Sequence, residues 1–153
     1  MTTAGPEFRT ARADDPADIR ALLKHAGLPF EDLQADAMPD FVVLRGAHGE
    51  LLATGGIERY GEDGLLRSVA VSDVARGTGL GKAIAAAMER HARAKGIGSL
   101  YLLTTTAAAF FPRLGYEVFE RHAVPAAVAK SAEFVSLCPA SAVCLKKNLE
   151  QAP

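Results

Sequence analysis

The sequence predicts a mixed α/β fold in which one sheet carries helices on both sides. Three observations lead to this prediction. Short apolar segments typical of strands recur along the chain, two amphipathic segments with helical spacing lie between them, and a glycine-rich loop connects one strand to the longer helix. Strands joined by a crossover helix are parallel, so we expect one parallel pair in a sheet that otherwise contains antiparallel hairpins.

The bulk composition favours a single globular domain over residues 1–153. Hydrophobic residues make up 49% of the 153 residues, charged residues make up 23%, and the formal net charge is −1. This balance argues against disorder and provides no overall field that would attract nucleic acid or an anionic membrane. No apolar stretch reaches the roughly 18 residues that span a bilayer, and residues 1–12 do not resemble a secretory signal. We therefore expect a cytoplasmic protein without nucleic-acid or membrane partners.

The first half should contain one helix among strands. Asp14 or Asp15 suits the helix cap, Pro16 its first turn and Gly27 its end. The expected elements are a strand at residues 8–11, this helix, a turn with a short helix or loop at 28–33, and strands at 41–44 and 51–60 joined by a hairpin at 47–49.

The second half should alternate strands and helices. The expected elements are a turn at residues 61–64, a strand at 65–71, a long helix after the glycine-rich loop, a strand at 100–104, a short helix through 110–111, and strands at 116–120 and 142–145. Gly96 should end the long helix. The alanine-rich segment 123–137 predicts a further helix with Pro125 in its first turn.

The glycine-rich loop is the most informative segment. It runs Arg76-Gly77-Thr78-Gly79-Leu80-Gly81-Lys82 at the start of the long helix. Glycines let successive N–H groups converge, and the helix start adds its positive end, so the loop is suited to hold a pyrophosphate. A Walker A loop would need Ser or Thr after the lysine, but Ala83 stands there. A dinucleotide-binding fold would place the glycines after the first strand, and a plain helix-entry turn would explain one glycine rather than three.

Three segments together resemble the GNAT superfamily of N-acetyltransferases. The loop matches its Arg/Gln-x-x-Gly-x-Gly/Ala motif, Val69-Ala70-Val71 matches the strand before it, and the segment from Phe110 to Tyr116 matches a later motif. The resemblance implies a mostly antiparallel twisted sheet of about seven strands with a splayed parallel central pair, flanked by helices. It implies acetyl-CoA as cosubstrate, without a metal. The residues it implies for acetyl-CoA binding are Val69, Ala70, Val71, Arg76, Gly77, Thr78, Gly79, Leu80, Gly81, Lys82 and Phe111.

The family pattern also implies the chemistry, and here the sequence departs from it. An amine attacks the thioester carbonyl, backbone N–H groups near residues 69–71 meet the developing oxyanion, and a tyrosine four residues before Gly115 often protonates the thiolate. That position holds Phe111. Either the thiolate leaves unprotonated, since its pKa is near 8.5, or another hydroxyl serves. The nearby hydroxyl candidates are Thr105, Thr106, Tyr116 and Ser141, of which we take Thr105 and Ser141 as the catalytic choices.

Two charged residues deserve a functional interpretation: Arg67 in the expected cofactor strand at 65–71, and Glu58 on the strand beside it. Glu58 is the candidate base for the amine, although it also suits a solvated ion pair with Arg59. Arg67 has the same parity as Val69 and Val71, and a charge inside an apolar strand is costly unless it meets an anion. That anion is either an acid group of the substrate or a carboxylate of Glu58, Glu62 or Asp63.

A narrower resemblance concerns the acceptor. Residues 102–106 and 134–142 look like the arsenic-resistance N-acetyltransferases, and the Leu-Thr-Thr run and Phe111 are also similar to N-acetylglutamate synthase catalytic domains. Both groups imply the α-amino group of a small glutamate-like amino acid, with Thr104 and Thr106 joining Glu58 and Arg67 around it. The first group implies arsinothricin or phosphinothricin and thus detoxification. The second implies glutamate acetylation for arginine synthesis.

Other possibilities stay open at this level. A weakly catalytic or non-catalytic module that binds acetyl-CoA or an arsenical is compatible with Phe111. The segment 123–137 is suited to a lid, to a homodimer contact or to plain packing on the sheet. Cys138 and Cys144 are two soft ligands for trivalent arsenic, but buried structural cysteines are commoner.

Overall fold

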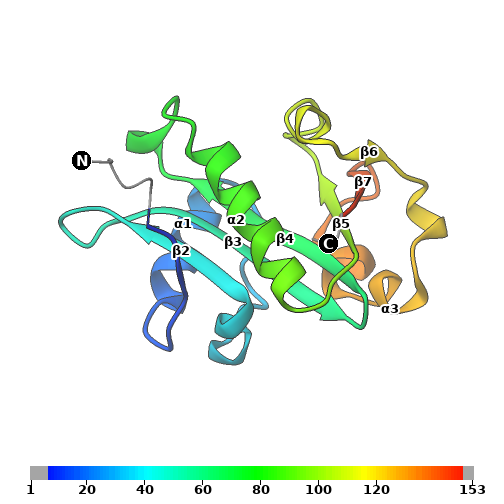
Figure 1. Cartoon of the computed structure of the whole chain (residues 1–153), viewed down its shortest axis with the longest axis horizontal. Coiled ribbons are helices and arrows are strands. Elements are labelled where there is room, and N and C mark those ends of the chain that lie inside the picture. The colour runs from blue at the N-terminus through cyan, green and yellow to red at the C-terminus, as the bar shows by residue number, and fades with distance from the viewer. Residues whose placement is uncertain (1–6, 150–153) are drawn as a thin grey trace. The chain divides into compact units, whose positions relative to one another are not determined.

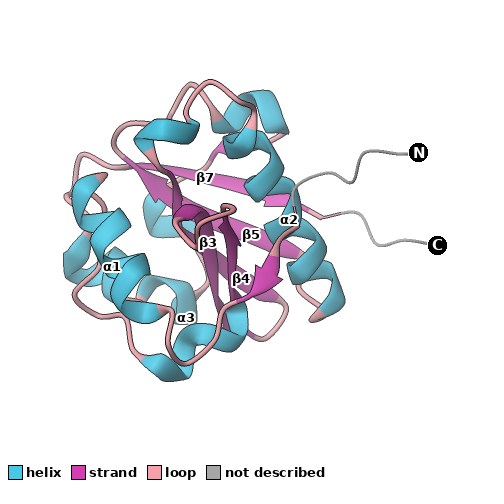
Figure 2. Cartoon of the chain, turned by 90° about the vertical axis from the view of Figure 1, so that its left-hand side faces the viewer, coloured by secondary structure: helices cyan, strands magenta, loops and turns pink. Residues whose placement is uncertain are grey.

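The computed structural model describes residues 7–149, which form strands and helices (Figures 1 and 2). The strands are β1 (Arg9–Thr10), β2 (Phe41–Arg45), β3 (Leu51–Tyr60), β4 (Asp63–Val71), β5 (Ser99–Thr104), β6 (Glu117–Val118) and β7 (Val143–Asn148). The α-helices are α1 (Pro16–His25), α2 (Leu80–Ala94) and α3 (Ala126–Ala129). Four 3₁₀ turns and one π-helical turn are η1 (Ala35–Asp40), η2 (Asp73–Ala75), η3 (Phe111–Leu114), η4 (Arg121–Ala123) and η5 (Glu133–Leu137).

The described strands form one seven-stranded sheet in the order β1-β2-β3-β4-β5-β7-β6. The pairs β1–β2, β2–β3, β5–β7 and β6–β7 are antiparallel, whereas β4 and β5, which α2 connects, are parallel. The mixed α/β prediction is thus confirmed. The chain divides into two compact units: the described part of residues 1–56 with 68–88, and residues 57–67 with the described part of 89–153. The long elements β3, β4 and α2 each run through both units.

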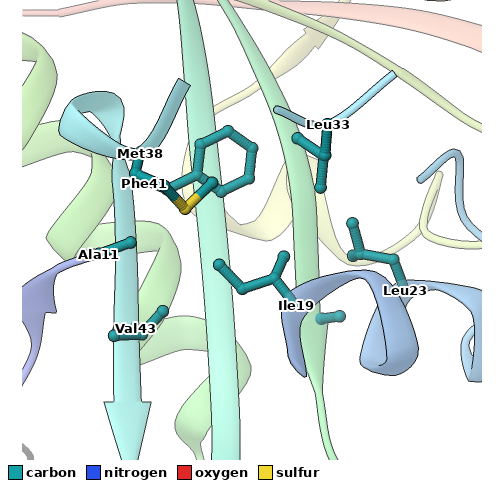
Figure 3. Packing of buried hydrophobic residues seen from close by; sticks show 8 residues of the cluster. Ala11, Ile19, Leu23, Leu33, Met38, Phe41 and Val43 are labelled. Atoms are coloured by element: carbon teal, nitrogen blue, oxygen red, sulfur yellow. The ribbon is translucent and has the colours of Figure 1, made fainter. Parts of the chain in front are cut away.

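In the first unit, α1 packs on one side of the antiparallel strands. Ile19 and Leu23 of α1, both fully buried, share a core with Phe41 and Val43 of β2, and their side chains converge in Figure 3. Ala11, Leu33, Met38 and Ala70 complete this core. The apolar spacing in α1 therefore identified the buried face of the helix correctly.

Two successive glycines of β3 allow both of its faces to be packed closely. A Cβ atom built at Gly56 would lie 2.4 Å from the Phe41 ring, which belongs to the α1 core. A Cβ atom at Gly55 would lie 2.8 Å from Cγ of Met88 in α2. Neighbouring strand residues point to opposite faces, so α1 and the first turns of α2 cover opposite faces of β3.

Asp15 occupies the cap position of α1 but does not cap the helix with its side chain. Its buried carboxylate instead accepts hydrogen bonds from Arg9 Nη1 at 2.8 Å, Arg45 Nη2 at 2.7 Å and the backbone N–H of Arg12 at 2.6 Å. These donors hold the pKa of Asp15 far below its usual value, against the effect of burial. The predicted cap is therefore corrected to an anchor that ties β1 and β2 to the start of α1.

In the second unit, the parallel register of β4 and β5 runs from Asp63 opposite Ser99 to Leu65 opposite Tyr101. Both strands continue beyond this paired segment, in agreement with the expected splay. On the other side of β5, β7 pairs antiparallel over all six of its residues, and β6 extends the sheet by two residues. The strand predicted at 116–120 is thus much shorter than expected, whereas β7 extends beyond residue 145.

The segment predicted as one helix at residues 123–137 is broken. It contains the single turn α3, preceded by Pro125, and the π-helical turn η5. Val128 of α3 packs against Tyr101 and Cys144 of the sheet. The alanine content favoured a continuous helix, but the observed break is accompanied by burial of Glu133. Tertiary contacts outweigh helix propensity here, because propensity differences between residues are small.

No helix among residues 7–149 is long and apolar enough to cross a membrane.

Candidate functional site

The glycine-rich loop has the backbone geometry of an anion cradle. Gly77 has a φ of 78° and Gly79 a φ of 81°, left-handed values that favour glycine. A Cβ atom built at either glycine would find no neighbour within 4 Å, so the space over the loop is open. The first hydrogen bond of α2 runs from Ala83 N to Gly79 O at 3.1 Å, and the N–H groups before it have no acceptor within the helix. The loop therefore fits a pyrophosphate group.

Side chains around the loop contribute positive charge and order. The Thr78 hydroxyl donates to the Ala75 carbonyl and closes the loop onto η2. Arg76 Nη2 lies 3.2 Å from Asp73 Oδ1, and His25 Nε2 lies 2.7 Å from Asp73 Oδ2. Lys82 is exposed on α2. The cofactor roles predicted for Arg76, Gly77, Thr78, Gly79, Leu80, Gly81 and Lys82 are compatible with this geometry and stay predictions.

The strand before the loop is interrupted at Ser68. This buried residue has a φ of 61°, the only positive φ of a non-glycine residue in the described chain. The parity that placed Arg67 on the face of Val69 and Val71 assumed an extended backbone at Ser68, which this φ departs from, so the shared face stays a prediction. Ala70 belongs to the α1 core, while Val69 and Val71 are half-buried. Backbone pairing of residues 69–71 with the cofactor stays a prediction.

In the second unit, Glu58 and Arg67 form an ion pair. Arg67 Nη1 lies 2.8 Å from Glu58 Oε2, and the Tyr60 hydroxyl donates to Glu58 Oε1 at 2.5 Å. A second carboxylate is present, because Arg67 Nε lies 3.4 Å from Glu133 Oε2 in η5. The side chains of Arg67 and Glu133 are 2% and 4% exposed, whereas that of Glu58 is 27% exposed. Two carboxylates thus face one guanidinium, and only Glu58 is open to solvent.

This cluster contains one of the two kinds of partner expected for Arg67, a carboxylate of the protein. The structure contains the carboxylate ion pair, with Glu58 as predicted and with Glu133 as an additional partner. Glu58 pairs with Arg67 on the neighbouring strand β4. A direct contact between Arg67 and a substrate anion stays a prediction.

The tyrosine of the cluster is a hydrogen-bond donor and a poor acid. Burial, followed by the bond to Glu58, raises the pKa of Tyr60 well above its usual value near 10. A phenol of this kind is a weaker acid than a thiol, so it cannot efficiently protonate a departing thiolate. Its role is to hold Glu58.

The hydroxyls proposed from sequence are placed differently from one another. Thr105, Thr106 and Ser141 are exposed, and Thr104 Oγ1 accepts from the N–H of Ala107 at 2.8 Å. Tyr116 is buried, and its hydroxyl finds no hydrogen-bond partner within the described residues. Burial raises its pKa, with the Glu89 charge acting in the same direction, so it is also a poor acid.

Phe111, at the usual tyrosine position, is a packed residue. It is 6% exposed, and its ring lies 5.1 Å from that of Phe110 and 5.3 Å from that of Tyr116, both edge to face. The predicted contact of Phe111 with the cofactor remains untested.

The cysteines are held as neutral thiols. Burial raises the pKa of Cys138 to about 12, with Glu133 acting in the same direction, and it raises the pKa of Cys144 to about 11. Cys138 Sγ lies 3.8 Å from Glu133 Oε1, while Cys144 packs with Tyr101 and Val128. In residues 7–149 no three His, Cys, Asp or Glu side chains gather as a metal site would require. These environments favour the packing interpretation over arsenic binding.

Sequence reasoning missed three members of the cluster: Tyr60, Ser131 and Glu133. Ser131 is buried, accepts from the N–H of Phe134 at 3.4 Å and hydrogen-bonds the Tyr60 side chain. Alternation along β3 would have placed Tyr60 on the face of Glu58. The break in the 123–137 segment, which brings Ser131 and Glu133 to the strands, has no comparable signal in the sequence.

A model of the acetyltransferase (GNAT) domain family matches residues 39–118, just over half of the chain. N-acetylglutamate synthase from Neisseria gonorrhoeae, solved with coenzyme A and N-acetyl-glutamate, is similar over 98% of this chain at 22% identity, with a TM-score of 0.84. This chain spans only 36% of that protein. Rv2747 from Mycobacterium tuberculosis, solved with CoA and NLQ, matches over 95% of this chain and 100% of its own at 24% identity, with a TM-score of 0.80. PaiA N-acetyltransferase from Thermoplasma acidophilum, solved with coenzyme A, covers 95% and 99% at 13% identity, with a TM-score of 0.66.

Proposed function

Because the chain belongs to the acetyltransferase (GNAT) domain family, we propose that it transfers the acetyl group of acetyl-CoA to the α-amino group of a small glutamate-like amino acid. One observation carries the proposal: Glu58 is a partly open carboxylate that Arg67 and Tyr60 hold at its two oxygens. A fixed carboxylate of this kind suits an incoming ammonium group and then the proton that the amine must lose.

Each group of residues has one role in the proposed reaction. The loop of residues 76–82 would hold the pyrophosphate of acetyl-CoA, and the backbone of residues 69–71 its pantetheine arm. Glu58 would receive the amine proton, directly or through water. Since Tyr60 and Tyr116 are both poor acids, the thiolate would leave without either of them as a proton donor, as its pKa near 8.5 allows. The exposed hydroxyls of Thr105 and Ser141 remain alternatives.

Two acceptor types follow from different observations. The sequence resemblance to arsenic-resistance N-acetyltransferases supports arsinothricin or phosphinothricin, whose acetylation would remove the ammonium group and so detoxify them. The fold of the Neisseria protein, solved with N-acetyl-glutamate, supports glutamate itself. In either case Thr104, Thr106 and Arg67 are the proposed neighbours of the acceptor.

Release of CoA from acetyl-CoA, with phosphinothricin, arsinothricin and glutamate as parallel acceptors, tests the proposal. We expect saturable turnover with at least one of the three. Glu58→Gln should lower kcat by about 10²–10⁴-fold, the range for loss of a general base. Glu62→Gln, which removes an exposed carboxylate, is the matched control. Equal activity in Glu58→Gln and wild type would refute the role of Glu58.

A non-catalytic acetyl-CoA-binding module is the second candidate, favoured by Phe111 at the usual tyrosine position. It predicts tight CoA binding without CoA release for any small amine.

A further inference from the structure

Glu133 is a buried carboxylate that the proposed reaction does not use. It is 3% exposed and begins the π-helical turn η5. Helices of this form are rare overall, and those that occur are often found at functional sites. Its two oxygens have different contacts: Oε2 lies 3.4 Å from Arg67 Nε, and Oε1 lies 3.8 Å from Cys138 Sγ. A buried charge is costly, so the fold retains this carboxylate against a considerable desolvation penalty.

The contacts form one chain of groups. Cys138 faces Glu133, Glu133 faces Arg67, Arg67 faces Glu58, and Glu58 accepts from the Tyr60 hydroxyl. The titratable and charged groups near Glu58 include Tyr60 and Arg59 on its own strand, Arg67 on β4, and Glu133 and Cys138 of the η5 segment. Arg121 also acts on this segment, because its charge lowers the pKa of Cys138 while the larger effects raise it.

Glu133 competes with Glu58 for the guanidinium of Arg67. An arginine forms its strongest pairs with carboxylates in two-pronged geometry, and such a pair makes the carboxylate a weaker base. With Glu133 present, the guanidinium is shared between two carboxylates. Glu58 is the more exposed of the two, so a cationic group from solvent can reach it.

We propose that Glu133 is a positioning residue for Glu58: by sharing the Arg67 guanidinium, it leaves the Glu58 carboxylate enough negative charge to receive the ammonium group of the acceptor. This inference rests on the proposed function. It also narrows the acceptor, since the cluster favours amines that arrive protonated, such as α-amino acids, over neutral aromatic amines.

The test compares Glu133→Gln and Glu133→Asp with the wild type and with Glu117→Gln, which removes an exposed carboxylate of β6. In Glu133→Gln, Glu58 is left as the carboxylate partner of Arg67 in this cluster and should become a weaker base. The acidic limb of the pH profile of kcat/KM for the acceptor should then move to lower pH by about one unit, and the plateau should fall by about 10–100-fold. The KM for acetyl-CoA should stay unchanged. Glu133→Asp keeps the charge and should keep the limb in place.

A second readout is independent of turnover. Carbon-13 NMR of labelled glutamate side chains, assigned with Glu58→Gln and Glu133→Gln, follows both carboxyl groups in the protein without substrates. We expect the Glu58 carboxyl signal at pH 7 to change in Glu133→Gln and to stay closer to its wild-type position in Glu133→Asp. A Glu58 signal that is the same in Glu133→Gln and in the wild type would overturn the inference. Absence of turnover in the wild type would instead refute the proposed function and leave the NMR result to be judged separately.

Discussion

Replacement of Gly79 by alanine isolates the contribution of the loop backbone to cofactor binding. At a φ of 81° an L-residue is disfavoured by about 1–2 kcal/mol, and the new Cβ would meet nothing within 4 Å. Any effect on the protein without CoA must therefore arise from backbone conformation rather than from overlap with other protein atoms. If the exposed loop relaxes to a negative φ, its N–H groups no longer converge, and the cost appears as weaker CoA binding.

Gly49 provides a matched control. It also has a φ of 81°, and a Cβ atom built on it would likewise meet nothing within 4 Å, but it lies in the hairpin between β2 and β3. Gly49→Ala should lower the free energy of unfolding by about 1–2 kcal/mol and leave CoA affinity unchanged. Gly79→Ala should weaken CoA binding by about 5–30-fold, because about 1–2 kcal/mol corresponds to that change in affinity when each factor of ten is worth about 1.4 kcal/mol.

Urea unfolding and isothermal titration with CoA measure both quantities. The reasoning is refuted if Gly79→Ala keeps the wild-type affinity for CoA while Gly49→Ala shows the expected loss of stability. In that case the left-handed conformation at residue 79 would not be needed for the cradle.

Three further predictions concern stability and thiol chemistry. Tyr116→Phe removes a buried hydroxyl without a partner in the described chain and should raise the free energy of unfolding by about 1 kcal/mol in urea; a loss of similar size would show that the hydroxyl is satisfied. Because the folded-state pKa of Asp15 is depressed, its contribution to the free energy of unfolding should be complete above pH 5 and decline as the pH falls below about 4, the pKa in the unfolded chain. Asp15→Asn should therefore lower the free energy of unfolding in urea by about 2 kcal/mol at pH 7 and by less at pH 3. An equal loss at the two pH values would contradict the ion pairs. Cys138 and Cys144 should react slowly with iodoacetamide at pH 7.5 in the folded protein and quickly in urea, whereas fast labelling of the folded protein would contradict their raised pKa values.

Elements with local signals could be predicted from the sequence. The strand at 51–60 coincides with β3, and the long helix begins at the glycine-rich loop and ends before Gly96 as expected. Hydrophobic spacing and glycine positions are local properties, and the rule for crossover connections then fixed the parallel pairing of β4 with β5. Glu58 and Arg67 were found because charges on apolar strands need a compensating partner.

Contacts between distant segments could not be predicted. The alanine-rich segment favoured one helix, but the structure breaks it and brings Glu133 to Arg67, 66 positions earlier in the chain. Helix propensity differs by only a few tenths of a kcal/mol among such residues, so tertiary contacts decide the outcome. Likewise nothing in the sequence marks Ser68 as left-handed, since serine has no preference for that conformation.

Identification of the acetylated product tests the central claim most directly. Wild-type protein is incubated with carbon-13-labelled acetyl-CoA and each of glutamate, phosphinothricin and arsinothricin, and the products are analysed by mass spectrometry and NMR. We predict an amide on the α-nitrogen of at least one acceptor, formed with one equivalent of CoA and strongly reduced in Glu58→Gln. Acetate as the only labelled product with all three acceptors, or no loss of acetyl-CoA at all, would contradict the claim.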